Sequence, residues 1–376
     1  MKIYTMIKTC LIFSLFTGCA VNNQPQIDSK KFKLEKNKDY LAQVGKDNKL
    51  YVIDAKKREI ANTCDIVGSS NPGALIISDD GRKAYVLQNS FQGIYGYDLE
   101  TCANFFQASL SKDNIRGISM FSLAISKDGN ELYTTYTPAQ KNIDTYTPLD
   151  PVFAVFDTNA GLNAQSVRSF KAPRQTTIMS IAHDGKVYSV GSNIYEIDPK
   201  TGDIKVKVKL RNWDKGDHSS PDSLAMWPIG KVSNEFMVMY TAAKFNDKEK
   251  NIENADFVWG ATRIDLTTGA VEQEDFAPIE TVMFTGMTHP KDSNILYGAL
   301  TELTKFDRKN QKVIKRVNLD HTYYCLNFAT DGSEIYIGGT YNDIAVYDPE
   351  TLDKVANIVL PDSDAGAGTL QVFRVQ

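Results

Sequence analysis

The sequence has 376 residues, of which 42% are hydrophobic and 23% are charged. A chain of this length and composition can bury most of its apolar surface in one large all-β domain or in two smaller domains. Its formal net charge of −4 argues against nucleic acid as a partner, because phosphate binding requires clustered Lys and Arg.

The first eighteen residues have the pattern of a secretory signal peptide. Lys2 and Lys8 accompany an apolar run that is too short to cross a bilayer, and small residues stand before Cys19. The ending "FTGC" resembles a bacterial lipobox, in which Cys19 is lipidated and becomes the first mature residue; ordinary cleavage is the alternative. We therefore expect a periplasmic protein whose membrane contact is made only through a lipid at Cys19.

A polar, Lys-rich segment follows the signal. Residues 19–38 include "NNQPQIDSKKFKLEKNK" and predict a flexible tether, which leaves residues 39–376 for the folded part. The folded part holds Cys64, Cys102 and Cys325. In an oxidising compartment Cys64 and Cys102 can form a disulfide, or they can be two small buried hydrophobic residues. The odd number of cysteines leaves at least one thiol free unless it pairs with another chain.

One pattern recurs seven times along the folded part: a short apolar strand, an Asp, a polar turn and a second strand. "NIYEIDPKTGDIKVKVKL" and "DIAVYDPETLDKVANIVL" are two of the copies. Four of the six spacings between the Asp residues are 41 to 44, near the period of about 40–45 residues of a propeller blade. We interpret these residues as turn starters rather than ligands. They are Asp54, Asp98, Asp157, Asp198, Asp265, Asp307 and Asp348.

Each copy also has an upstream half that reads as a hairpin. "GALIISDDGRKAYVLQ" and "LNFATDGSEIYIGG" each show a strand, an Asp-Gly-type turn and a second strand. One unit therefore has four strands, and seven units around an axis can cover both faces of every sheet. The first copy, from "DYLAQVG", has only three strands, and the C-terminal "TLQVFRV" supplies the fourth. The sequence predicts an all-β, seven-bladed propeller with four antiparallel strands per blade, closed by its C-terminal strand.

The order of the strands assigns the connections to two faces. We label the strands of each blade A to D from the axis outward. The turn face carries the A–B and C–D turns, which are nearly all tight. The link face carries the B–C loops and the D–A links, and these include the longest and most aromatic segments: 137–151, 170–177, 211–223, 242–260, 276–286 and 319–325. Binding residues usually lie on loops of a rigid scaffold, so we expect the binding surface on the link face; loop drift without function is the alternative.

Ten residues of the link face are candidates for contacting a partner or walling a substrate cavity. The aromatic candidates, expected to form apolar walls, are Trp213, Phe284, Tyr323 and Tyr324. The polar candidates are Arg174, Gln175, Asp217, His218, Asp222 and His321. Among these, Arg174, Asp217 and Asp222 are expected to orient the partner.

Motifs for catalysis or cofactor binding do not occur in the sequence. The four His residues form no H-E-x-x-H motif, and no Cys-x-x-Cys pair or c-type haem attachment motif is present. No Gly-x-Ser-x-Gly elbow and no phosphate loop occur. The adjacent pairs Asp217-His218 and Asp320-His321 fit loop polarity better than acid–base catalysis, which requires hydrogen-bond geometry. We therefore assign no catalytic, cofactor-binding or metal-binding residue to this chain.

Three segments carry a family resemblance. They are "FKAPRQTTIMSIAHDGKVYSVG", "WDKGDHSSPDSLAMW" and "LDHTYYCLNFATDGSEIYIGGTYNDIAVYDPETLDK". In this order they resemble the β subunit of quinohaemoprotein amine dehydrogenase, and the resemblance extends over about residues 39–374.

The resemblance implies a non-catalytic subunit of a periplasmic enzyme that oxidises primary amines. In that family a small γ subunit carries cysteine tryptophylquinone, and an α subunit with two c-type haems passes electrons to a soluble acceptor protein. The β propeller docks the γ subunit and helps to wall the substrate cavity. The lipobox-like start of this chain departs from a freely soluble subunit.

Two other functions remain open at this point. The first is a stand-alone, YncE-like periplasmic scaffold with another partner. The second is a propeller hydrolase such as a lactonase, which places acidic metal ligands around the central axis.

Overall fold

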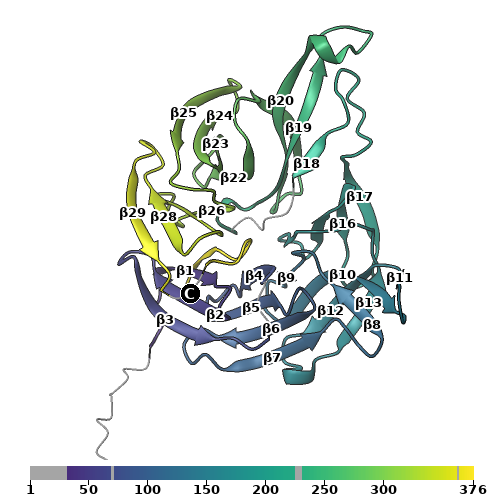
Figure 1. Cartoon of the computed structure of the whole chain (residues 1–376), viewed down its shortest axis with the longest axis vertical. Coiled ribbons are helices and arrows are strands. Elements are labelled where there is room, and N and C mark those ends of the chain that lie inside the picture. The colour runs from purple at the N-terminus through teal and green to yellow at the C-terminus, as the bar shows by residue number, and fades with distance from the viewer. Residues whose placement is uncertain (1–31, 69–71, 225–230, 362–363) are drawn as a thin grey trace, which may run out of the picture. The chain divides into compact units, whose positions relative to one another are not determined.

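A computed structural model of the chain describes residues 32–68, 72–224, 231–361 and 364–376. Their strands form an all-β ring of seven antiparallel sheets, as predicted (Figure 1). Within these ranges the helical elements are three short 3-10 turns: η1 (Gly161–Asn163), η2 (Lys231–Ser233) and η3 (Ile252–Asn254). None of the described helices is long and apolar enough to cross a bilayer.

Each sheet is one blade, listed here from its A strand to its D strand. Blade one contains β30 (Gln371–Arg374), β1 (Asp39–Val44), β2 (Lys49–Asp54) and β3 (Glu59–Asp65). Blade two contains β4 (Ala74–Ile77), β5 (Lys83–Gln88), β6 (Gly93–Asp98) and β7 (Asn104–Ser109). Blade three contains β9 (Ala124–Ile125), β10 (Glu131–Lys141), β12 (Val152–Asp157) and β13 (Ser166–Lys171), and β8 (Ile115–Ile118) and β11 (Tyr146–Pro148) extend it.

The remaining four blades are regular. Blade four contains β14 (Met179–Ile181), β15 (Val187–Val190), β16 (Asn193–Ile197) and β17 (Ile204–Lys209). Blade five contains β18 (Asp222–Leu224), β19 (Glu235–Phe245), β20 (Ala255–Asp265) and β21 (Val271–Pro278). Blade six contains β22 (Met283–His289), β23 (Asp292–Leu300), β24 (Glu302–Asp307) and β25 (Lys312–Asn318). Blade seven contains β26 (Cys325–Phe328), β27 (Ile335–Gly338), β28 (Asp343–Tyr347) and β29 (Lys354–Val359).

The C-terminal strand closes the ring, which confirms the predicted closure. β30 pairs antiparallel with β1, with Phe373 opposite Tyr40 and Val372 opposite Leu41. Blade one is therefore built from both ends of the chain, and the yellow end of Figure 1 lies beside its purple beginning.

The seven recurring Asp residues cap the turns that follow them. Their carboxylates accept hydrogen bonds from backbone N–H groups two or three residues further along, such as Asp98 from Thr101 at 2.8 Å and Asp348 from Thr351 at 2.7 Å. The other five Asp residues make the same bond. The N–H of Thr351 holds the pKa of Asp348 below its usual value. The repeat is therefore turn chemistry, as predicted.

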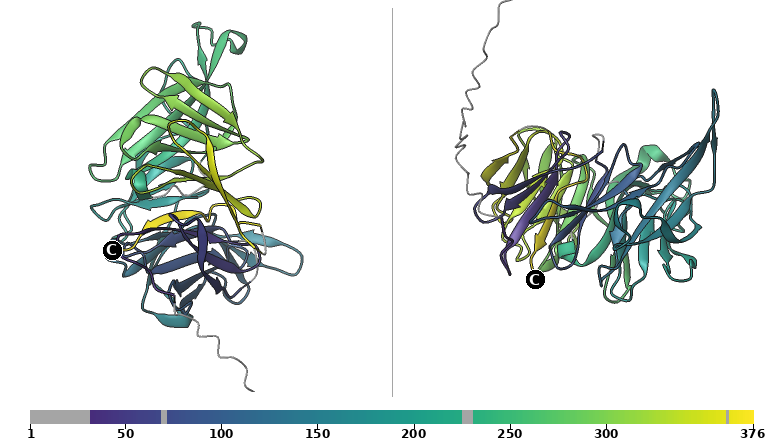
Figure 2. Two further views of the ribbon diagram at one scale, coloured as in Figure 1. Left: turned by 90° about the vertical axis from the view of Figure 1, so that its left-hand side faces the viewer. Right: turned by 90° about the horizontal axis from the view of Figure 1, so that it is seen from below.

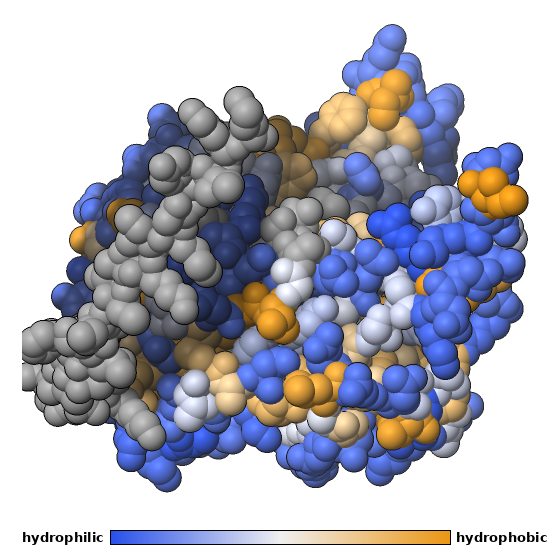
Figure 3. Space-filling model, turned by 60° about the horizontal axis from the view of Figure 1, so that its bottom comes forward, coloured by the Kyte–Doolittle hydropathy of each residue, from blue (hydrophilic) through white to orange (hydrophobic). Residues whose placement is uncertain are grey.

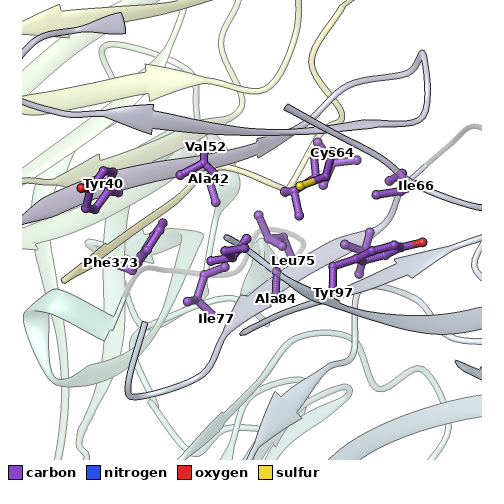
Figure 4. Packing of buried hydrophobic residues seen from close by; sticks show 14 of the residues in the cluster. Tyr40, Ala42, Val52, Cys64, Ile66, Leu75, Ile77, Ala84, Tyr97 and Phe373 are labelled. Carbon is purple, nitrogen blue, oxygen red and sulfur yellow. The ribbon is translucent and has the colours of Figure 1, made fainter. Parts of the chain in front are cut away.

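The hydrophobic core lies between neighbouring sheets. The described residues form seven clusters, one at each boundary between two blades. Between blades one and two, Tyr40 stacks on Phe373 with ring centroids 5.7 Å apart, and Leu75, Ile77 and Tyr97 belong to the same cluster (Figure 4). Both faces of each sheet are covered, which explains why the inner strands are almost continuously apolar.

A disulfide joins blades one and two. Cys64 of β3 is bonded to Cys102 in the C–D turn of blade two, which resolves the choice that the sequence left open. Cys325 is free and buried. Burial raises the pKa of its thiol above the usual value.

The compact unit begins at Phe32, within the segment expected to be a tether. Leu34 is buried, and its N–H donates to Glu100 at 2.8 Å. Lys38 pairs with the buried Asp54 at 2.8 Å. The predicted signal at 1–18, the lipidated Cys19 and the start of the tether lie outside the described residues.

Candidate functional site

The two long inserts of the link face are hairpin arms rather than irregular loops. In blade three β10 continues past the blade and pairs with β11 and β8. In blade five β19 and β20 remain paired from Glu235–Asp265 to Phe245–Ala255. Both arms extend beyond the body of the propeller in the edge-on views (Figure 2). Alternating β-branched, aromatic and polar residues, as in "YTTYTPAQ", favour this extension.

The arm of blade five is hydrogen-bonded along one edge and at its tip. Along the β19 edge, the N–H of Ser219 donates to Ala243 O at 2.8 Å, and the N–H of Phe245 donates to Asp217 O at 2.7 Å. At the tip, Asp247 accepts from the N–H of Asn251 at 2.9 Å and from Asn254 Nδ2 at 3.0 Å. The bond from Asn251 lowers the pKa of Asp247. The arm is thus ordered before any partner arrives.

Exposed hydrophobic side chains are concentrated on the link face. The described residues include sixteen large hydrophobic side chains that are exposed, and nine of them lie in B–C loops or D–A links. These nine are Val67, Met120, Ile143, Tyr146, Ile252, Phe257, Ile279, Val282 and Tyr341. Six others lie on outer strands, and of the turn-face residues that the structure describes Leu162 alone is such a side chain. Hydrophobic surface is visible at projecting edges and in patches over the body in Figure 3.

His218 anchors the link between blades four and five. Its Nε2 lies 2.8 Å from Asp275 Oδ2 and its Nδ1 lies 2.7 Å from Asp217 Oδ1. A carboxylate can only accept a hydrogen bond, so in each of these bonds the imidazole N–H is the donor and the Asp oxygen is the acceptor. The hydrogen bond from His218 lowers the pKa of Asp217. The side chain of His218 is 5% exposed, whereas that of Asp217 is 60% exposed. Asp217 therefore remains available to a partner, and His218 serves the scaffold.

Tyr240 and Lys215 complete this network. The Tyr240 hydroxyl donates to Asp275 Oδ1 at 2.9 Å and accepts from Lys215 Nζ at 3.0 Å. Trp213 packs edge-to-face on Tyr240 at 4.8 Å, and the Lys215 ammonium lies 4.6 Å from the Trp213 ring. Burial, followed by the Asp275 charge, raises the pKa of Tyr240 well above its usual value, so the residue remains a phenol. The Tyr240 ring lies where a side chain on Gly260 would be, 2.0 Å from its Cβ position, so this position requires glycine.

Replacing Tyr240 with Phe is expected to lower the free energy of unfolding by about 1–3 kcal/mol, because Asp275 and Lys215 each lose a buried partner. Urea unfolding measures the effect. Tyr146→Phe, at an exposed position, is the matched control and should change stability by less than about 0.5 kcal/mol. Equal effects from the two substitutions would show that the network contributes nothing.

A second His–Asp–Tyr group lies between blades six and seven. His321 Nε2 lies 2.8 Å from Asp343 Oδ1, and the Tyr323 hydroxyl donates to Asp343 Oδ2 at 2.9 Å. His321 also stacks on Tyr323, with centroids 4.0 Å apart. Tyr323 has no exposed surface, so it supports the link from below and does not form the apolar wall we expected. Burial, followed by Asp343, raises the pKa of Tyr323.

The remaining candidates lie at the surface. Phe284 and Tyr324 are half-buried, and their rings meet edge-to-face with centroids 5.5 Å apart. Arg174 and Gln175 are exposed, and Arg174 lies 3.7 Å from Asp150 of the blade-three arm. Asp222 is exposed at the start of β18.

The ten candidates thus form three groups on one face rather than one constellation. The blade four–five link holds Trp213, Asp217, His218 and Asp222, and the blade six–seven side holds Phe284, His321, Tyr323 and Tyr324. Arg174 and Gln175 make up the third group, on the blade three–four link. No set of three or more His, Cys, Asp or Glu residues that could hold a metal ion occurs in the described part of the chain.

Sequence reasoning missed the residues that connect these groups to the blades. Asp275 and Tyr240 lie on strands far from the link in sequence, and Lys215 was read as part of a loop. A glycine in mid-strand, Gly260, is a signal for close approach of a neighbouring ring. Tyr341, in the tight turn "GGTYND", was also missed. A large aromatic residue in such a short turn indicates that its side chain contacts a binding partner rather than the core.

A cavity of about 890 Å³ opens on the turn face, where no binding surface was expected. It lies between blades one and seven and is lined mainly by charged side chains. Many of these are paired, as in Arg58 with Glu334 at 2.5 Å and Arg374 with Asp39 at 2.5 Å. The first pair connects blade one to blade seven and the second connects the closing strand β30 to β1, so both support the closure of the ring.

Known proteins resemble this chain in fold and not in sequence. No family model matches the chain, and no curated protein matches it. The dihydro-haem d1 dehydrogenase NirN has a TM-score of 0.52 at 12% identity, over 92% of this chain and 76% of that chain. A functionally unknown protein from Desulfotomaculum acetoxidans has a TM-score of 0.56 at 9% identity, over 90% and 99%. AztD from Citrobacter koseri has a TM-score of 0.50 at 13% identity, over 89% and 97%. At these identities the likenesses concern architecture alone, and the chain is a seven-bladed β-propeller.

Proposed function

We propose that this chain is a non-catalytic propeller that docks a partner polypeptide on its link face. The concentration of exposed hydrophobic side chains on that face, against a single one among the described residues of the turn-face connections, is the observation that carries the proposal. Exposed apolar surface of this kind marks interaction sites in soluble proteins.

The two arms suit such docking because they are already ordered. Ile143 and Tyr146 lie in the blade-three arm, and Ile252 and Phe257 lie in the blade-five arm, all more than half exposed. Hydrogen bonds along the β19 edge and at the tip hold the blade-five arm, so binding would cost less conformational entropy. Aromatic side chains presented on a rigid element are efficient anchors.

The more specific form of the proposal names the partner. The resemblance of the segments around 170–191, 213–227 and 319–354 supports a β subunit of a periplasmic quinohaemoprotein amine dehydrogenase. In that assembly the link face would dock the small quinone-bearing γ subunit and help to wall the cavity for a primary amine. Asp217, Asp222 and Arg174 would orient the partner, and Trp213, Phe284 and Tyr324 would contact it. The di-haem α subunit would complete the complex.

Affinity purification of the full chain from its native source tests both levels of the proposal. Recovery with a haem-staining subunit and a small quinone-staining subunit supports the amine dehydrogenase. Recovery with a different protein supports docking and rejects that assembly. Recovery of the chain alone, under conditions that preserve known periplasmic complexes, would overturn the docking function.

Placing a charge on each arm should weaken the recovered complex at least tenfold. The double substitution Ile143→Asp with Phe257→Asp alters two exposed side chains and should leave the fold intact. Leu162→Asp, half-exposed on the turn face, is the matched control and should bind as wild type. Dissociation constants from surface plasmon resonance measure both. Equal affinities for all three proteins would exclude the arms from the interface.

A further inference from the structure

A pocket of about 300 Å³ opens on the link face at the seam where the chain closes the ring. We call it the seam pocket; it is lined by Lys46, Thr322, Tyr324, Gly339, Thr340, Tyr341, Asp364, Ala365 and Ala367. Lys46 comes from the B–C loop of blade one, Tyr341 from the B–C loop of blade seven, and Asp364 from the link that leads to β30. With Thr322 and Tyr324 of the link between blades six and seven, four separate segments therefore meet around one small cavity.

Backbone hydrogen bonds hold the first three of these segments together. The N–H of Lys46 donates to Asp364 O at 2.8 Å, and the N–H of Ala365 donates to Tyr341 O at 3.0 Å. Gly339 has a φ of +92°, and a Cβ there would lie 2.8 Å from Cys325 Sγ, so only glycine fits this wall. The backbone therefore fixes the relative positions of the segments that line the pocket.

The walls of the seam pocket are aromatic and hydroxylic. Tyr341 is 57% exposed, and its ring is held from one side by His321, with centroids 4.6 Å apart. Tyr324 is supported by Phe284. Thr340 adds a hydroxyl group, which donates a hydrogen bond to the carbonyl oxygen of Thr322. Two supported tyrosine rings offer a surface for a flat or branched apolar group.

The rim of the pocket carries one positive and one negative charge. Lys46 Nζ lies 3.5 Å from Asp364 Oδ2, and the two side chains are 52% and 49% exposed. An ion pair this long and this exposed contributes little to stability. The backbone bond between the same two residues keeps their side chains next to each other, and both charges are accessible from the pocket.

We propose that the seam pocket binds a free α-amino acid with an aromatic or branched apolar side chain. In such a ligand the ammonium and carboxylate are attached to the same carbon, so its two charges are as close together as those of the rim. The carboxylate would pair with Lys46 and the ammonium with Asp364, which replaces one weak pair by two charge-assisted ones. The ligand's side chain would pack between Tyr324 and Tyr341. Tyr324 and Tyr341 also belong to the surface proposed for docking, but the ligand test below needs no partner, so failure of docking and failure of ligand binding are distinguishable.

Ligand binding at this place would also support ring closure. The ligand would contact blade one through Lys46, blade seven through Tyr341, and the closing link through Asp364. A ligand that binds only the closed ring raises the stability of the folded state in proportion to the logarithm of its concentration. Thermal unfolding is therefore a direct readout of binding.

The test uses the wild-type protein, calorimetric titration and thermal unfolding with phenylalanine, leucine and three analogues. N-acetylphenylalanine lacks the ammonium, phenylalanine amide lacks the carboxylate, and glycine lacks the side chain. We expect phenylalanine and leucine to bind and to raise the melting temperature, and each analogue to bind at least tenfold more weakly. Equal binding of phenylalanine and its amide, or no heat and no shift with any amino acid, would overturn the proposal.

Substitutions at the rim locate the binding. Lys46→Met should abolish the preference for phenylalanine over phenylalanine amide. Asp364→Asn should abolish the preference for phenylalanine over N-acetylphenylalanine. Tyr341→Ala should weaken the binding of phenylalanine more than the binding of glycine. Lys57→Met removes an exposed lysine on the turn face and should bind as wild type. Binding that is unchanged in all the rim variants would place the ligand elsewhere and reject the seam pocket.

Discussion

Removing residues 371–376 is expected to leave a chain that no longer unfolds in one cooperative transition. The deletion removes β30 and with it Val372, Phe373 and Val375, which are all buried. At about 2 kcal/mol per buried side chain the loss is about 6 kcal/mol, before the hydrogen bonds to β1 are counted. Globular proteins have only about 5–15 kcal/mol of net stability. The expected result is an open ring that loses its near-UV circular dichroism and is cut by protease within blades one and seven.

A graded form of the same prediction keeps the protein folded. Phe373→Ala should lower the free energy of unfolding by about 3–5 kcal/mol, because it leaves a cavity against Tyr40 and Leu75. Arg374→Ala, next in the strand and 45% exposed, should lose at most about 1 kcal/mol. Urea unfolding compares the two. If both substitutions lower the free energy of unfolding by the same amount, packing of the inner face of β30 does not stabilise the closed ring.

The architecture was predictable because each of its signals is local. The capping Asp, the Asp-Gly-type turns and the strand lengths repeat in every copy, and each is a short-range property of the chain. Closure needed only a count of strands in the first copy. The first strand begins at Asp39, where the propeller was expected to start, but residues 32–38 are not a free tether. A Lys-rich composition predicts a tether, whereas the burial of Leu34 depends on a partner 66 residues away, Glu100.

The site was predictable as a face but not as a set of contacts. Tyr323 and Tyr324 show why: neighbouring residues in extended chain point to opposite sides, and composition cannot say which one points inward. Here Tyr323 is buried on Asp343 and Tyr324 is at the surface. The rim of the seam pocket pairs Lys46 with Asp364, which are 318 residues apart. Only the closed ring brings such residues together.

The position of blade one connects these observations. Its outer strand is joined covalently to blade two, its inner strand comes from the C-terminus, and its B–C loop forms the rim of the seam pocket. Blade one is therefore both the place where the ring could open and a place where a ligand could hold it shut. Its two attachments differ in kind: one depends on packing and the other on the redox state of two cysteines.

Reduction of the Cys64–Cys102 disulfide is expected to lower the free energy of unfolding by about 4 kcal/mol. The bond closes a loop with a sequence separation of 38 residues, and the loss of that constraint in the unfolded chain accounts for the estimate. For a compact unit of this size the melting temperature should fall by about 5 °C. Scanning calorimetry with and without a thiol reductant measures the change.

The double substitution Cys64→Ala with Cys102→Ala separates the bond from any other effect of the reductant. It should melt at the temperature of the reduced wild type and should show no further shift when reductant is added. Cys325→Ala, at the buried free thiol, should keep the full response to reductant, because its sulfur belongs to no disulfide. A reductant effect that persists in the double variant would contradict the assignment. The absence of any shift in the wild type would mean that packing between blades one and two, rather than the covalent link, holds this side of the ring.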